Sequence, residues 1–147
     1  MAKKVKNTGL IPEKLQFLAD LGRTSAWISN RYTTFLKPYG ISTQQFNILR
    51  VLRTANDWIA MHKVNELLII KSPNITRLAD KLVAKALINR NRSVEDRRVV
   101  YVQITDDGRK LLAQIDKEHE GELSDYMDSF TKEEAIMMAE ILKRIRA

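Results

Sequence analysis

The stretch from Leu67 to Thr105 constrains the fold most, because its apolar periodicity changes partway along. Apolar side chains first recur at three- and four-residue steps, which predicts a helix with one buried face; they are Ile75, Leu78, Ala79, Leu82 and Ala86. Ser72 is a suitable N-cap for this helix, and Pro73 suits its first position. Val100, Val102 and Ile104 then alternate with Val99, Tyr101 and Gln103, which is a strand pattern.

The segments on either side of that helix complete a recognisable unit. A first helix is expected from Met61 to Ile70, and a strand from about Leu87 to Arg92 pairs with the strand that ends at Ile104. The polar segment 93–98 connects the two strands. Two helices followed by an arginine-rich hairpin form a winged helix-turn-helix, in which the second helix enters a major groove and the hairpin reaches the adjacent backbone or minor groove. The sequence therefore predicts a DNA-binding fold.

Basic charge is concentrated on the same part of the chain. The net charge is +7, and the region from Lys71 to Lys110 holds ten Lys or Arg against five Asp or Glu. From His119 to Phe130 there is no Lys or Arg, while four residues are acidic. Net charge alone is equally compatible with a basic protein that binds no polyanion. Its position on the predicted helix and hairpin favours nucleic acid as the partner.

Two motifs resemble the MarR family of bacterial transcription regulators. The run from Asp96 to Gly108, DRRVVYVQITDDG, is similar to the family's wing, which has Asp-x-Arg, a short β run and a Thr-x-x-Gly that opens a long helix. The run from Ser72 to Leu82 is similar to the family's recognition helix, and the match extends from about Tyr39 to Leu112. At Ala86 the family usually has glycine. An alanine in a left-handed turn would cost about 1 kcal/mol, unless the turn is made differently.

The resemblance and the periodicity together imply a mainly α chain, α+β by strict count, forming a single MarR-like domain over residues 1–147. The winged helix-turn-helix occupies 42–104, and long amphipathic helices over 10–37 and 106–146 are expected to serve dimerisation. Their apolar stripes fit either a tighter monomer core or a dimer interface, and we favour the homodimer. Thr105 and Thr131 are expected to cap the last two helices, and residues 1–10 to form a basic tail.

The predicted DNA contacts lie on the polar side of the recognition helix and on the hairpin. Asn pairs well with adenine and Arg with guanine, while Ser, Thr and Lys reach base edges or phosphates. The resemblance assigns Arg98 to the minor groove, with Asp96 orienting it. The predicted DNA-binding residues are Ser72, Asn74, Thr76, Arg77, Lys81, Arg92, Asp96, Arg97 and Arg98. For each of them, an ordinary solvated surface position is the alternative interpretation.

The resemblance further implies a pocket for a small aromatic or phenolic effector, with Arg23, Trp27, Phe46 and Trp58 as candidate lining residues. The chain has no cysteine, and its sequence contains no catalytic or phosphate-loop motif, so we expect no enzyme activity, cofactor or metal. We expect a cytoplasmic repressor that binds a palindromic operator in double-stranded DNA and makes no membrane contact. The alternative is a winged-helix architectural or protein-interaction module without base-specific readout.

Overall fold

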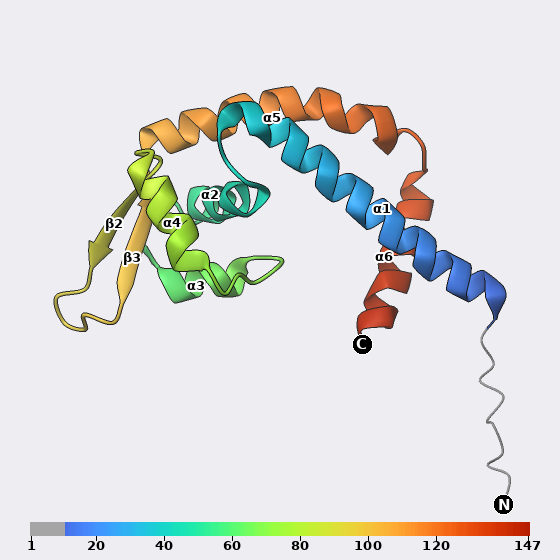
Figure 1. Ribbon diagram of the computed structural model, residues 1–147, viewed down its shortest axis with the longest axis horizontal. Helices are drawn as coiled ribbons and strands as arrows, with labels where there is room; N and C mark the ends of the chain where they lie inside the picture. Colours follow the sequence, from blue (N-terminus) through green and yellow to red (C-terminus); the bar gives the residue numbers. More distant parts are fainter. Residues whose placement is uncertain (1–10) are drawn as a thin grey trace, which may run out of the picture. The chain divides into compact units, whose positions relative to one another are not determined.

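The computed structural model describes residues 11–147 and divides into two compact units, one ending at Thr43 and the other beginning at Gln44 (Figure 1). The first unit holds helix α1 (Pro12–Leu36) and the 3-10 helix η1 (Lys37–Tyr39). The basic tail predicted for residues 1–10 lies outside the described residues.

Helix α1 lies within the predicted range 10–37. Pro12 occupies its first position, where the missing N–H costs no hydrogen bond. Gly40 follows η1 with a φ of 69°, a left-handed conformation that glycine adopts easily. Much of the apolar stripe of α1 remains accessible, since Leu15, Leu18 and Trp27 are each nearly half exposed.

The second unit contains a winged helix-turn-helix, as predicted. Its elements in chain order are α2 (Thr43–Ala55), β1 (Ile59–Ala60), α3 (Met61–Leu67), α4 (Ile75–Ala84), β2 (Ile88–Arg92), β3 (Val100–Ile104), α5 (Asp106–Met127) and α6 (Lys132–Arg146). The antiparallel sheet has the order β1-β3-β2, so the hairpin strand β3 lies in the middle. Helices α3 and α4 lie beside this hairpin (Figure 1). The mainly helical fold class is confirmed.

One apolar core holds these elements together. Its fully buried side chains come from α2, α3, α4, the sheet and the first half of α5, and they include Ile48, Leu49, Leu52, Val64, Leu82, Ile88, Val102, Leu112 and Ile115. Each such side chain contributes about 1.5–3 kcal/mol through burial. The core therefore fixes α4 and the hairpin on a common base.

The structure corrects the predicted boundaries around the helix-turn-helix. Helix α3 ends at Leu67 and not at Ile70, and Leu67 is 54% exposed. Ser72 is not the N-cap of α4, which begins at Ile75 with Asn74 in the cap position. The reason is that Ser72 is buried and its backbone N–H is bound by the side chain of Asn65, which bends the chain before the helix starts.

The turn after α4 adopts the left-handed conformation in spite of its alanine. Ala86 has a φ of 57°, its N–H donates to the carbonyl of Val83 at 2.9 Å, and the N–H of Leu87 donates to the carbonyl of Leu82 at 3.0 Å. This pair of bonds is the Schellman motif, in which glycine usually fills the position of Ala86. The Thr105 hydroxyl donates to the Ala86 carbonyl at 2.7 Å and accepts the N–H of Gly108 at 3.0 Å, so it also caps α5 as predicted.

Helix α6 opens with the predicted capping box, in which Thr131 and Glu134 exchange side-chain to backbone hydrogen bonds. The sequence left open whether its apolar stripe joins a monomer core or a dimer interface. No residue of α6 is buried, and Ile136, Met137 and Ile145 are at least half exposed among the described residues. Between residues 11 and 147, no helix combines the length and apolar character needed to cross a membrane.

Candidate DNA-binding site

Helix α4 presents a polar face to solvent opposite its buried face. Ile75, Ala79 and Leu82 pack into the core at one-turn spacing. The intervening positions stay exposed, and they carry Thr76, Arg77, Asp80 and Lys81, with Asn74 exposed just before the helix. Four of the predicted base-contacting residues, Asn74, Thr76, Arg77 and Lys81, are thus accessible along the start and the free side of one helix.

The fifth predicted residue in this region has a different environment. Ser72 is only 4% exposed, and its hydroxyl accepts the backbone N–H of Asn74 at 3.3 Å. Its side chain therefore shapes the segment before α4 and does not form part of the exposed face.

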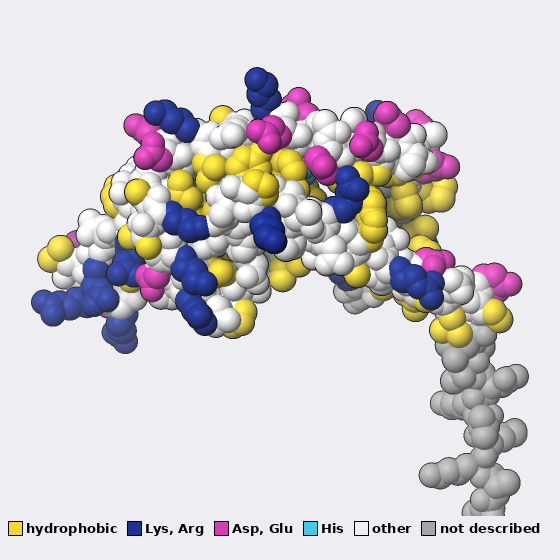
Figure 2. Space-filling model, turned by 45° about the horizontal axis from the view of Figure 1, so that its top comes forward, with side chains coloured by type: hydrophobic (Ala, Val, Ile, Leu, Met, Phe, Trp, Pro, Cys, Tyr) yellow, Lys and Arg dark blue, Asp and Glu magenta, His cyan; other side chains and the backbone are white. Residues whose placement is uncertain are grey.

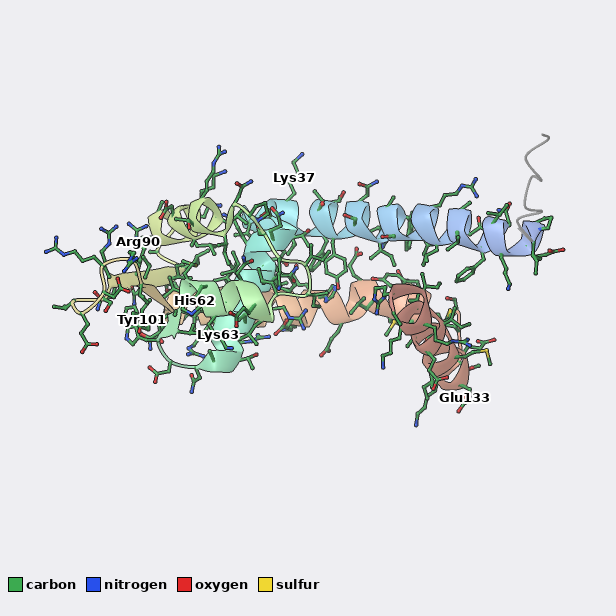
Figure 3. The ribbon with its side chains drawn as sticks, turned by 90° about the horizontal axis from the view of Figure 1, so that it is seen from below. Lys37, His62, Lys63, Arg90, Tyr101 and Glu133 are labelled. Atoms are coloured by element: carbon green, nitrogen blue, oxygen red, sulfur yellow. The ribbon has the colours of Figure 1, made fainter. Side chains whose placement is uncertain are left out.

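The register of the hairpin aims two arginines toward α4. Ile88 pairs with Ile104, Arg90 with Val102 and Arg92 with Val100, so the alternate residues of β2 share the face that packs against the helices. Arg90 Nη1 forms an ion pair with the Asp80 carboxylate of α4. Figure 3 labels Arg90 on the hairpin. This contact connects β2 to the recognition helix across their shared face.

At the hairpin tip, Asp96 organises the turn that carries Arg98. The Arg98 backbone N–H donates to Asp96 Oδ1 at 3.0 Å, and Arg98 Nε lies 3.4 Å from the same oxygen. The Arg98 side chain is 94% exposed, so the ion pair itself contributes little to stability. Asp96 instead fixes the backbone at Arg98, and the Arg98 guanidinium extends into solvent from that fixed point. The remaining predicted wing residues, Arg92 and Arg97, are also exposed.

A cleft of about 350 Å³ separates the helix-turn-helix from the hairpin, and we call it the arginine cleft. Arg90, Arg92 and Arg98 line it from the hairpin side, Thr76 from α4, and His62 and Asn65 from α3. Three guanidinium groups around one concavity make it suited to anionic groups such as phosphates. Sequence reasoning missed His62 and Asn65; the available signal was their one-turn spacing on the helix that precedes the recognition helix.

Charge is divided along the second unit. Figure 2 shows Lys and Arg side chains gathered around the hairpin and α4, while Asp and Glu side chains follow α5. An anionic polymer is therefore attracted to the end that carries the recognition helix.

The four candidate effector residues are divided between the two units. Phe46 is 2% exposed in the core of the second unit, while Trp58 is 41% exposed beside β1. In the first unit, Trp27 contacts the Arg31 guanidinium, and Arg23 pairs with Asp20 at 2.8 Å. An apolar groove of about 370 Å³ does lie between α2 and the segment after α3, but neither Phe46 nor Trp58 lines it.

Comparisons with known proteins agree with this geometry. The family pattern described as transcriptional regulator SarA/Rot matches residues 31–115, which is more than half of the chain. The HTH-type transcriptional regulator MhqR of Bacillus subtilis is 29% identical over 133 residues, covering 90% of this chain and 91% of that protein.

Two solved structures share the fold. A mutant MarR from E. coli complexed with operator DNA has a TM-score of 0.74 at 24% identity and covers 90% of this chain and 95% of its own. An organohalide-sensing transcriptional regulator in its 2,4-dichlorophenol-bound form has a TM-score of 0.80 at 15% identity, and the match covers 99% of this chain and 88% of that regulator's chain. With its polar recognition helix, arginine-bearing wing and matching family pattern, the chain belongs to the SarA/Rot group of MarR-type winged-helix proteins and is a DNA-binding transcription regulator, not an enzyme.

Proposed function

We propose that this protein is a homodimeric repressor that binds a palindromic operator with sequence specificity, and that a small aromatic or phenolic molecule modulates its binding. The observation that carries the proposal is the continuous surface formed by the exposed face of α4 and the arginine-bearing hairpin. It offers side chains for base edges beside side chains for phosphates. A protein that repressed transcription from such an operator would act in the cytoplasm.

Asn74, Thr76, Arg77 and Lys81 read the major groove in this proposal. Arg92 and Arg97 contact phosphates, and Arg98, positioned by Asp96, enters the adjacent minor groove, where a narrow A·T-rich segment has an enhanced negative potential. The exposed face of α4 supports the first assignment, and the 94% exposure of the Arg98 side chain supports the last. The buried Ser72 contributes through backbone geometry only.

Exposed apolar side chains support the homodimer. Helices α1 and α6 carry them at helical spacing, including Leu15, Leu18, Trp27, Ile28, Ile136, Met137 and Ile145. Where such side chains form an exposed apolar patch, the patch mostly marks an interaction site on a protein that is stable in water. A two-fold symmetric dimer would place two recognition helices on one face of the duplex, about one helical turn apart.

Modulation by an effector is supported by the dichlorophenol complex of the organohalide-sensing neighbour and by the apolar groove beside α2. Operator binding measured with and without 2,4-dichlorophenol tests this part of the proposal. A ligand that releases DNA would support repression that is relieved by small phenols. Unchanged DNA affinity at millimolar ligand would remove phenols from the proposal.

Selection of bound duplexes from a random DNA pool, at roughly physiological salt, tests the central claim. We expect enrichment of a palindrome whose half-sites lie about one turn apart. Sedimentation of the same protein preparation should give the mass of a dimer. Strong binding without any enriched sequence would instead favour an architectural module, whose affinity falls with salt equally on all duplexes.

A further inference from the structure

The segment from Leu68 to Asn74 determines where the recognition helix begins. It is fixed at two buried points, Leu68 at 8% exposure and Ser72 at 4%. Between them, Ile69 and Ile70 are 93% and 83% exposed, so apolar packing does not hold the middle of the segment. The position of the helix start therefore depends on what fixes Ser72.

Ser72 is fixed by a side chain of the preceding helix. Asn65 Oδ1 accepts the backbone N–H of Ser72 at 2.9 Å, and the Ser72 hydroxyl accepts the backbone N–H of Asn74 at 3.3 Å. Pro73, between them, has no N–H to donate. The N-cap residue Asn74 makes no side-chain capping bond of its own. The two backbone N–H groups immediately before α4, those of Ser72 and Asn74, thus both have a side-chain acceptor. The acceptor for Ser72 is Asn65.

The core makes Asn65 a firm anchor. Its neighbour Val64 is fully buried on α3, so the carboxamide of Asn65 projects from a helix that cannot shift without disturbing the core. The residues that follow the anchored segment are Asn74, Thr76 and Arg77, the group proposed to read bases. Hydrogen bonds from such side chains to base edges require placement within a few tenths of an ångström, since hydrogen bonds weaken steeply outside their normal geometry.

We propose that Asn65 is a positioning residue for sequence-specific DNA binding: it fixes the start of the recognition helix through Ser72. This inference rests on the proposed function and adds to it a residue on α3 that acts through the backbone of the following segment. Loss of the Asn65 carboxamide would leave the Ser72 N–H buried and unsatisfied, which favours another arrangement of the segment.

Asn65 also lines the arginine cleft, so a direct contact with the DNA backbone is the competing explanation. The two roles have different signatures. A phosphate contact by this uncharged side chain strengthens binding to every duplex alike. A positioning contact changes the preference for operator over unrelated sequence and leaves the salt dependence alone.

The test uses the full chain with Asn65→Ala, Asn65→Asp and a matched control, Asn89→Ala, at an exposed asparagine of β2. Aspartate keeps an oxygen that accepts the Ser72 N–H, whereas alanine removes it. Amide hydrogen exchange at Ser72 is measured in the free protein. Affinity is measured for the selected operator and for a scrambled duplex over a series of salt concentrations.

For Asn65→Ala we expect faster exchange at Ser72 and about tenfold weaker operator binding, with scrambled-duplex affinity and salt dependence unchanged. Asn65→Asp should restore both the protection of Ser72 and the preference for operator, and Asn89→Ala should match the wild type. Faster exchange with an unchanged operator preference would overturn the proposal, as would equal losses on both duplexes. If the wild type itself shows no preference, the proposed specificity fails and the positioning role fails with it, while normal Ser72 protection would still report the hydrogen bond.

Discussion

Replacing Ala86 by glycine should stabilise the protein, although it removes a methyl group and adds no contact. Ala86 occupies the left-handed position of the Schellman turn with a φ of 57°. An L-residue with a Cβ loses about 1–2 kcal/mol there. Glycine removes that cost but adds about 0.5–1 kcal/mol of backbone entropy to the unfolded chain. The expected net gain is about 0.5–1 kcal/mol.

The matched control is Ala84→Gly, two residues earlier. Ala84 is the last residue of α4, is exposed like Ala86 and has helical geometry. Glycine there introduces the same entropy cost with no strain to relieve, so it should destabilise by about 0.5–1 kcal/mol. The two glycine variants should therefore lie on opposite sides of the wild type, and their free energies of unfolding should differ from each other by about 1–2 kcal/mol.

Urea unfolding at a fixed protein concentration measures both changes, because a dimer's midpoint depends on concentration. The slope of the transition should be the same for all three proteins, since no buried surface changes. A midpoint for Ala86→Gly that is equal to or below the wild-type value would refute the strain argument. It would mean that the Thr105 hydroxyl bond to the Ala86 carbonyl, at 2.7 Å, already relieves the turn.

The remaining predictions concern the wing, the base of α5 and pH. Arg98→Ala should weaken operator binding by about 1–3 kcal/mol in a titration while the mass of the protein in sedimentation stays that of the wild type, and unchanged affinity would remove Arg98 from the interface. Asp96→Ala should also weaken binding in that assay, although it removes a negative charge, because the tip loses its hydrogen bond to the Arg98 backbone; tighter binding would point to simple repulsion. Gly108→Ala should cost about 3 kcal/mol in urea unfolding, since a Cβ would lie 2.3 Å from the Leu87 carbonyl oxygen; an unchanged midpoint would contradict this close approach. Burial lowers the pKa of His119 below its usual value, so the contribution of this group to folding stability is fully present above about pH 6.5 and is lost as pH falls toward the lowered pKa. Urea unfolding at pH 7.5 and pH 5 should show a smaller difference for His119→Gln than for the wild type.

The parts of the fold that follow from local patterns were predictable from the sequence. The change from helical to alternating periodicity located α4 and β3, and Thr105 and Thr131 marked helix starts that the structure confirms. The absence of glycine at position 86 raised a question about the turn, which the structure answers with a left-handed alanine. In each case the signal and the structure it specifies lie within a few residues of one another.

Contacts between distant residues were not predictable in this way. Serine is a residue type that favours the N-cap position, so the sequence predicted a helix start at Ser72. The helix starts later because Asn65, seven residues earlier, accepts the backbone N–H of Ser72. The same holds for Arg90, whose partner Asp80 depends on how β2 packs against α4. For α6, the pattern identified an apolar face correctly but did not specify what covers it, and within one chain it stays exposed.

These distant contacts bear on function because α4 is short. A helix of 10 residues is marginal in isolation, so its direction depends on what holds it. Asn65 acts at its start through Ser72, Gln45 Nε2 reaches the Leu78 carbonyl in its middle at 3.5 Å, and Arg90 binds Asp80 toward its end. Because none of these three side chains is among the residues proposed to contact DNA, substitutions there should alter which sequence is preferred. For Arg90, which also lines the arginine cleft, affinity for every duplex should fall as well. Specificity in this protein would then be a property of the supporting side chains as much as of Asn74 and Arg77.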